Sequence, residues 1–160
     1  MGGGQTGLMA ADFAIRSGVK VTLVDSMPTF GRKFLMAGKS GLNLTMHEDG
    51  KVFRKNVTHN GNLINRALDE FGPIEVIKWA NSLGIQTFIG STGRVFPKAM
   101  KASPLLRNWI TNLDEIGVLR KNRWNLKSLS NKVATFETPQ SLVNEAADGI
   151  IFSIRWSKLA

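Results

Sequence analysis

The chain has no cysteine, and its 160 residues include just two histidines, His47 and His59. The absence of cysteine excludes disulfide bonds, thiolate metal ligands and cysteine nucleophiles. A zinc site built on two histidines would need carboxylates beside them, and the sequence shows no such cluster, so we expect no metal site. Because cysteine-free chains suit a reducing compartment, we expect a cytoplasmic protein.

Long apolar runs are missing as well. No stretch approaches the ~18 uninterrupted apolar residues that a membrane-spanning helix needs, so we expect no membrane association. No basic segment leads into an apolar run, as it does in a secretory signal. Repeats, low-complexity tracts and linkers rich in proline, glycine or serine are also absent, and nothing marks a domain boundary inside the chain.

Acidic residues are few, since 12 Asp and Glu stand against 21 Lys and Arg and leave a formal net charge of +9. Eight of the basic residues fall in one part of the sequence: Arg94, Lys98, Lys101, Arg107, Arg120, Lys121, Arg123 and Lys127. Such a cluster is typical either of solvated faces or of a surface for a polyanion. A basic nucleic-acid-binding module therefore stays an alternative, although no recognised binding motif accompanies the charge.

The order of expected elements indicates an α/β fold. A glycine run is followed by a predicted helix over residues 6–17, which Gly18 ends, and by an apolar strand over residues 19–24. Further helices are expected over residues 74–83, after Pro73, and from Ser103 as N-cap to residue 116. Short strands are expected over residues 85–89, 118–121, 124–129, 132–137 and 149–152, and the second to fourth of these read as a β-meander. Helices alternating with strands predict a parallel sheet with helices on its faces.

The glycine run has the pattern G-x-G-x-x-G and stands directly before a helix. Gly2 allows a tight turn, Gly4 lets the backbone approach a pyrophosphate, and Gly7 lets the helix pack closely on the sheet. Gln5 and Thr6 between them offer backbone N–H groups to the phosphates at the positive end of the helix dipole. Asp25, followed by Ser26, ends the next strand, where a carboxylate accepts hydrogen bonds from ribose hydroxyls. Together these features predict a dinucleotide site.

A second segment, residues 31–45, is basic and rich in glycine. It supplies the cations Arg32 and Lys33, then flexible backbone at Gly38 and Gly41, and then the side chains of Asn43 and Thr45. Such a loop can wrap a phosphate–ribityl stretch with backbone N–H donors. An ordinary surface loop explains the same composition, and the residues alone do not decide between the two.

Several stretches resemble the BaiN-like NAD(P)/FAD-dependent oxidoreductases, in a branch of uncharacterised flavoproteins. They are GGGQTGLMAADFAIRSG, VDSMP, GRKFLMAGKSGLNLT, GSTGRVFPKAMKASPLLRNW and the closing WSKL. The resemblance implies a Rossmann-like fold of the flavoprotein type with two dinucleotide-binding domains, holding FAD non-covalently. It assigns the glycine loop to the FAD pyrophosphate, Asp25 to the adenosine ribose, and Lys33, Gly38, Gly41, Asn43 and Thr45 to a second FAD-contacting motif. The signature Gly93-Arg94-Val95-Phe96-Pro97 receives no role.

The resemblance also sets expectations about activity. In a full-length relative, NAD(P)H is the expected electron donor, the flavin passes the hydride on, and the organic acceptor, a small molecule, is unknown. No catalytic residue, Ser/His/Asp arrangement or oligomeric state can be identified from the sequence. Any redox chemistry is expected to be performed by the flavin.

The sequence departs from the family pattern in three places. Only Met1 precedes Gly2 where the family has a strand, the substrate domain and C-terminal segment are absent, and the glycine pair expected after Phe152 is missing. We therefore expect residues 1–160 to be a partial FAD/NAD(P)-binding domain, an N-terminal fragment of a flavoprotein. Alone it is expected to bind FAD poorly, with a fraying glycine loop, and to be inactive.

Overall fold

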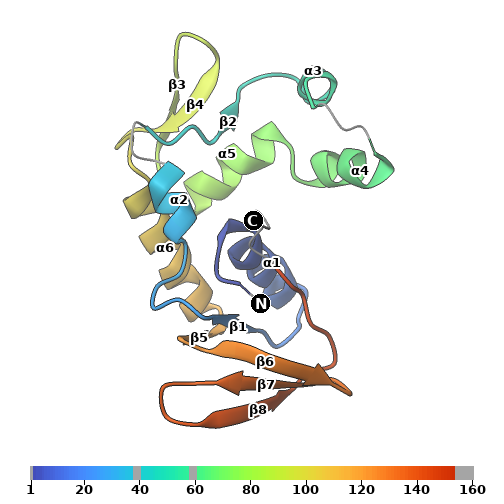
Figure 1. Cartoon of the computed structure of the whole chain (residues 1–160). Coiled ribbons are helices and arrows are strands. Elements are labelled where there is room, and N and C mark those ends of the chain that lie inside the picture. Colours follow the sequence, from blue (N-terminus) through green and yellow to red (C-terminus); the bar gives the residue numbers. More distant parts are fainter. Residues whose placement is uncertain (1, 38–40, 58–60, 154–160) are drawn as a thin grey trace, which may run out of the picture. The chain divides into compact units, whose positions relative to one another are not determined.

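The structure is a computed structural model that describes residues 2–37, 41–57 and 61–153. The chain divides into two compact units. Unit 1 combines Met1–Phe34 with Ile110–Ala160, and unit 2 is Leu35–Trp109 between them. The chain passes from one unit to the other within helices α2 (Arg32–Ala37) and α6 (Ala102–Glu115) (Figure 1).

Unit 1 contains the parallel strands β1 (Thr22–Asp25) and β5 (Leu119–Asn122), which pair from Thr22↔Leu119 to Asp25↔Asn122. Helix α1 (Gln5–Arg16) packs against β1. The strand starts later than the predicted residue 19, because Gly18 at φ +82° ends α1 and the Val19 N–H donates to the Ala14 carbonyl at 3.2 Å. Residue 19 therefore finishes the helix cap instead of starting the strand.

The second sheet of unit 1 is an antiparallel meander of β6 (Asn125–Ser130), β7 (Val133–Glu137) and β8 (Leu142–Ala146). It packs against the parallel pair through the buried residues Val24, Ala134 and Phe136. The strands predicted over residues 124–129 and 132–137 are β6 and β7 of this meander. The strand predicted over residues 118–121 was wrongly placed in the meander, since it pairs with β1 as β5, and β8 was not predicted.

Residues 149–152, predicted as a buried strand, form no strand in the structure. Ile151 is 59% exposed and Phe152 is 45% exposed. The apolar run Ile150-Ile151-Phe152 is compatible with a buried strand, but apolar sequence alone does not supply the neighbouring strand that would bury it.

In its described residues, unit 2 holds a three-stranded antiparallel sheet and three further helices. The sheet order is β2-β4-β3, formed by β2 (Thr45–Met46), β3 (Thr87–Ile89) and β4 (Arg94–Pro97), so β4 is central. The helices are α3 (Gly50–Lys55), α4 (Asn62–Glu70) and α5 (Pro73–Ser82). Among these, α3 packs on α4, and α5 packs on β2 and β3.

Helix α6 has the buried apolar face that the sequence predicts, with Leu105, Trp109 and Leu113 each at most 2% exposed. Trp109 meets Trp79 edge to face, with 4.8 Å between ring centroids, so the partly buried indole of Trp79 packs against the core residue Trp109. The helix begins at Ala102, which places Ser103 inside the first turn and makes its predicted N-cap role wrong. No helix in the described ranges is long and apolar enough to span a membrane.

Candidate functional site

Three glycines of the glycine loop in unit 1 have different structural roles. Gly2 has φ +106°, a left-handed conformation, and its N–H donates to the Val24 carbonyl at 2.8 Å. A Cβ on Gly7 would lie 1.7 Å from the Gly2 carbonyl oxygen, so Gly7 permits close packing of helix and loop. A Cβ on Gly4 would meet nothing within 4 Å. Gly4 thus leaves open space at the start of α1, where a ligand can approach the backbone.

The start of α1 presents free backbone donors. Gly4 is the N-cap and makes no side-chain cap bond, and the first turn carries no acidic residue. Leu8 donates its N–H to the Gly4 carbonyl at 2.9 Å, whereas the N–H groups of the exposed Gln5 and Thr6 have no partner within the described ranges. The positive end of the helix dipole is therefore available to an anion in the open space beside Gly4.

Asp25 lies against this loop. Its Oδ2 accepts a hydrogen bond from the Gly3 N–H, and its Oδ1 accepts one from the Met27 N–H at 2.7 Å. The carboxylate that the sequence predicts as a ribose ligand thus also anchors the loop, and each oxygen keeps a further lone pair. Ser26 beside it is exposed.

Gly3 is a loop residue that the sequence pattern did not single out. The Gly3 carbonyl accepts from the Gly31 N–H at 2.7 Å, and a Cβ on Gly3 would lie 2.1 Å from the Phe30 ring. The run of three consecutive glycines was the signal that could have pointed to it. Arg32 and Lys33 follow as exposed residues at the start of α2.

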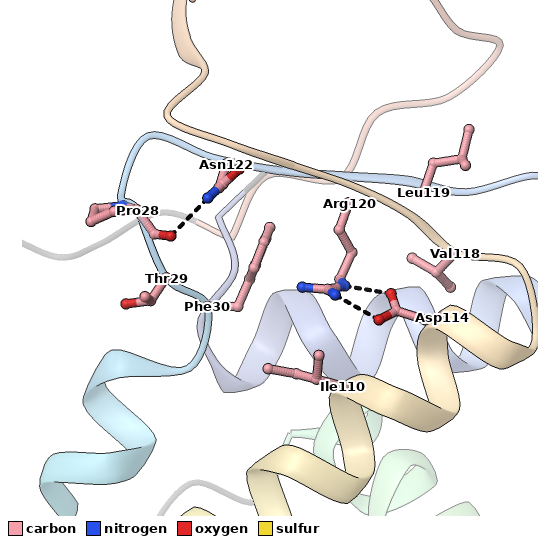
Figure 2. Close-up of a pocket in the computed structure, with 9 residues that line it drawn as sticks. All are labelled: Pro28, Thr29, Phe30, Ile110, Asp114, Val118, Leu119, Arg120 and Asn122. Atoms are coloured by element: carbon pink, nitrogen blue, oxygen red, sulfur yellow. Dashed lines mark hydrogen bonds and ion pairs between the residues drawn. The ribbon is translucent and has the colours of Figure 1, made fainter. Parts of the chain in front are cut away.

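Phe30 also lines a cavity of about 570 Å³ in unit 1 (Figure 2). In it, Arg120 forms a two-bonded ion pair with Asp114, with both N···O distances 2.6 Å, and its guanidinium lies 5.3 Å from the centroid of the Phe30 ring. Asn122 closes one side by donating to the Pro28 carbonyl at 2.8 Å. No sequence pattern pointed to this cavity, since its walls come from segments that are far apart along the chain.

Of the second motif, Lys33 belongs to unit 1, whereas Gly38, Gly41, Asn43 and Thr45 belong to unit 2, which is described by itself. Gly38 lies outside the described residues. Gly41 has φ +122°, Asn43 is exposed, and Thr45 is buried in β2, where it pairs with Val95. The strand that pairs with this motif is β4, whose sequence is the signature that had no assigned role. The sequence did not predict this pairing.

The structure describes one of the two histidines. His47 is exposed and donates its backbone N–H to the Gly93 carbonyl at 2.8 Å, and His59 lies outside the described residues. Within the described part of the chain, no group of three or more His, Cys, Asp or Glu residues could hold a metal ion.

Two solved structures show the fold. Over 89% of this chain, the structure is similar to 3-ketosteroid-Δ4-(5α)-dehydrogenase from Rhodococcus jostii RHA1 in complex with 4-androstene-3,17-dione, with a TM-score of 0.66 and 13% identity. Over 91% of the chain, it is similar to Thermovibrio ammonificans THI4, with a TM-score of 0.52 and 15% identity. The chain spans 42% and 52% of the lengths of these two proteins.

A family match agrees with this fold. The sequence matches the Rossmann domain of HI0933-like proteins over residues 1–153. This match confirms the predicted Rossmann-like α/β class and the resemblance to this group of proteins. The chain therefore belongs to the HI0933-like family and carries its Rossmann domain.

Proposed function

We propose that this chain is the FAD-binding part of a flavin-dependent oxidoreductase. The observation that carries the proposal is the open space at Gly4, between the N-terminus of α1 and a carboxylate at the end of β1. Rossmann domains bind a dinucleotide pyrophosphate at a helix N-terminus of this kind, with the acidic residue on the ribose.

Unit 1 supplies the part of the site that recognises the adenosine and the pyrophosphate. Gly2 shapes the turn, Gly4 leaves room for a phosphate, and Gly7 brings the helix close. Gln5 and Thr6 donate backbone N–H groups, and Asp25 with Ser26 binds the adenosine ribose. Arg32 and Lys33 add positive charge that offsets the charge of the phosphates.

Unit 2 supplies a second contact, from Gly38, Gly41, Asn43 and Thr45. In our proposal, the exposed Asn43 donates hydrogen bonds to the phosphate–ribityl stretch of the cofactor. Thr45 contributes from within the sheet by holding the end of the loop, because its side chain is buried.

Bound FAD supplies hydride transfer, while the protein binds and orients it. We propose NAD(P)H as the electron donor of the full-length protein and a small organic molecule as the acceptor. The similar protein from Rhodococcus jostii is a dehydrogenase, which agrees with a redox role for this fold.

Nucleic-acid binding is the weaker alternative. Within the basic cluster, Arg120 is paired with Asp114 and Lys127 with Glu137, at 2.6 and 2.8 Å. These pairs reduce the positive field available to a polyanion. A gel-shift assay at moderate salt separates the two functions, because a nucleic-acid complex weakens steeply as salt rises.

The direct test is a titration of the chain with FAD. Binding is followed by flavin fluorescence and by the ¹⁵N chemical shifts of the protein. The titration extends to millimolar FAD so that weak binding is detected. We expect saturable binding with shifts at the amides of the glycine loop. The variant Gly4→Val fills the open space with a branched side chain and should abolish these shifts.

Gly50→Val is the matched control, since a Cβ there also meets nothing within 4 Å and Gly50 lies at the start of another helix. This control should bind FAD as the wild type does. A wild-type chain without saturable FAD binding, or a Gly4→Val chain that binds equally well, would refute the proposed function.

A further inference from the structure

Two separate sequence motifs lie side by side in unit 2 (Figure 1). Strand β2 pairs with β4 through Thr45↔Val95 and Met46↔Arg94. Hydrogen bonds continue this pairing beyond the strands. The Leu42 N–H donates to the Met100 carbonyl at 3.1 Å, the Leu44 N–H to the Val95 carbonyl at 2.9 Å, and the His47 N–H to the Gly93 carbonyl at 2.8 Å. Residues 93–100, the positioning segment, therefore hold residues 42–47 at three backbone positions.

Between two of these fixed positions lies Asn43. Leu42 and Leu44 are held by their N–H groups, while Asn43 between them is exposed. Neither its backbone N–H nor its side chain has a hydrogen-bond partner among the residues that the structure describes. The neighbours thus fix the backbone of Asn43 while its donors remain available, which is the arrangement that a pre-organised polar contact needs.

The positioning segment is itself held firmly. Val95 is 1% exposed, and the Lys98 N–H donates to the Gln86 carbonyl at 2.9 Å next to β3. The Met100 N–H donates to the Pro97 carbonyl at 2.8 Å and closes a turn. The segment is therefore anchored to the sheet on the side away from the loop.

Met100 lies at the end of the positioning segment and is the residue through which that end contacts residues 41 and 42. It has φ +58°, a left-handed conformation that a residue with a Cβ adopts at a cost. A Cβ on Gly41 would lie 2.9 Å from the Met100 Cε, so the methionine side chain reaches the start of the loop. Both its carbonyl and its side chain thus act on residues 41 and 42.

We propose that residues 93–100 act as a template that presents Asn43 to the phosphate–ribityl part of the cofactor, and that Met100 is a positioning residue. This inference rests on the proposed function and gives a role to the signature over residues 93–97. Asn43 makes the contact, and the segment contributes by limiting the conformations of the loop before the ligand arrives.

The test compares two ligands on one protein. FAD contains the phosphate–ribityl stretch, whereas ADP carries the adenosine and pyrophosphate alone. The change Met100→Gly keeps the carbonyl that accepts from Leu42, removes the side chain at Gly41 and frees the backbone. We expect FAD affinity to fall about two- to fivefold, while ADP affinity stays within about a factor of two.

Lys132→Gly is the control, since Lys132 also has a left-handed φ of +64° but lies in the β6–β7 turn of unit 1. It should leave both affinities unchanged. Asn43→Ala is the second variant, because an exposed loop residue can be replaced without unfolding the chain. It should lower FAD affinity about tenfold and leave ADP affinity unchanged.

The outcomes separate the two hypotheses. If the wild-type chain binds neither FAD nor ADP, the proposed function fails. If it binds both but Met100→Gly and Asn43→Ala leave FAD affinity unchanged, the template is refuted and the proposed function stands. Equal losses for FAD and ADP would show general damage to the fold and would also overturn the template. A loss confined to FAD supports it.

Discussion

Replacing Gly7 with alanine should weaken folding, although alanine is the better helix former. The new Cβ would stand 1.7 Å from the Gly2 carbonyl oxygen, where ordinary contact begins near 3.4 Å. The loop must therefore retract, which strains or breaks the 2.8 Å hydrogen bond from Gly2 to Val24. That bond is worth about 0.5–1.5 kcal/mol, and such crowding costs about 1–3 kcal/mol.

Alanine returns about 1 kcal/mol through its helix propensity, so the expected net loss in the free energy of unfolding is about 2 kcal/mol. The assays are urea unfolding and thermal unfolding, both followed by circular dichroism, and in the thermal experiment the melting temperature should fall by about 4–8 °C. Gly4→Ala is the control, because its Cβ has no neighbour within 4 Å. It should lose about 1 kcal/mol or less, as an alanine N-cap does. A Gly7→Ala chain as stable as the wild type would refute the close packing of helix and loop.

Three further predictions concern unit 1. Lys132→Gly should raise the free energy of unfolding by about 0.5 kcal/mol in urea, because glycine adopts its left-handed turn without strain; a loss of stability would contradict this. Arg120→Gln should lower the free energy of unfolding by about 1 kcal/mol, because it breaks the partly exposed ion pair with Asp114. In a double-mutant cycle, Asp114→Asn should cost little further stability once Arg120 is replaced; additive losses of stability would argue against the pair. A hydrogen bond from Lys127, and then its positive charge, hold the pKa of Glu137 below its ordinary 4.5, so this pair stabilises the fold above pH 4.5 and loses that effect as pH falls through the lowered pKa. Urea unfolding at pH 3 and pH 6 should therefore show a slightly smaller acid sensitivity in Lys127→Met, and an unchanged sensitivity would rule out a role for the pair.

Local signals made the start of the chain predictable. The glycine pattern, the helix that Gly18 ends and the carboxylate of Asp25 all depend on residues close in sequence, and the structure places them around one loop. These features can be recognised from residue type, because glycine is required wherever a Cβ would collide with the backbone. The hydrogen bond from Gly3 to Asp25 was beyond this reasoning, since any residue at that position has an N–H.

Long-range pairing was not predictable in the same way. Strand β4 could be recognised only as a family signature, and its partner β2 lies about fifty residues earlier. A two-residue strand such as Thr45–Met46 cannot be predicted from the sequence, because it is too short to show the alternation of apolar and polar residues that marks a strand. The cavity beside Phe30 was missed for the same reason, since Arg120 reaches it from a distant strand.

The insertion of unit 2 into unit 1 has a consequence for the order in which the protein acquires its structure during synthesis. Thr22 of β1 pairs with Leu119 of β5. A ribosome that adds about 5–20 residues per second makes the second strand about 5–20 s after the first. All of unit 2 is translated in that interval and can fold while β1 still lacks its partner. Unit 1 is therefore completed last, and Leu23 and Val24 stay exposed to chaperones and to other nascent chains until β5 and the meander emerge.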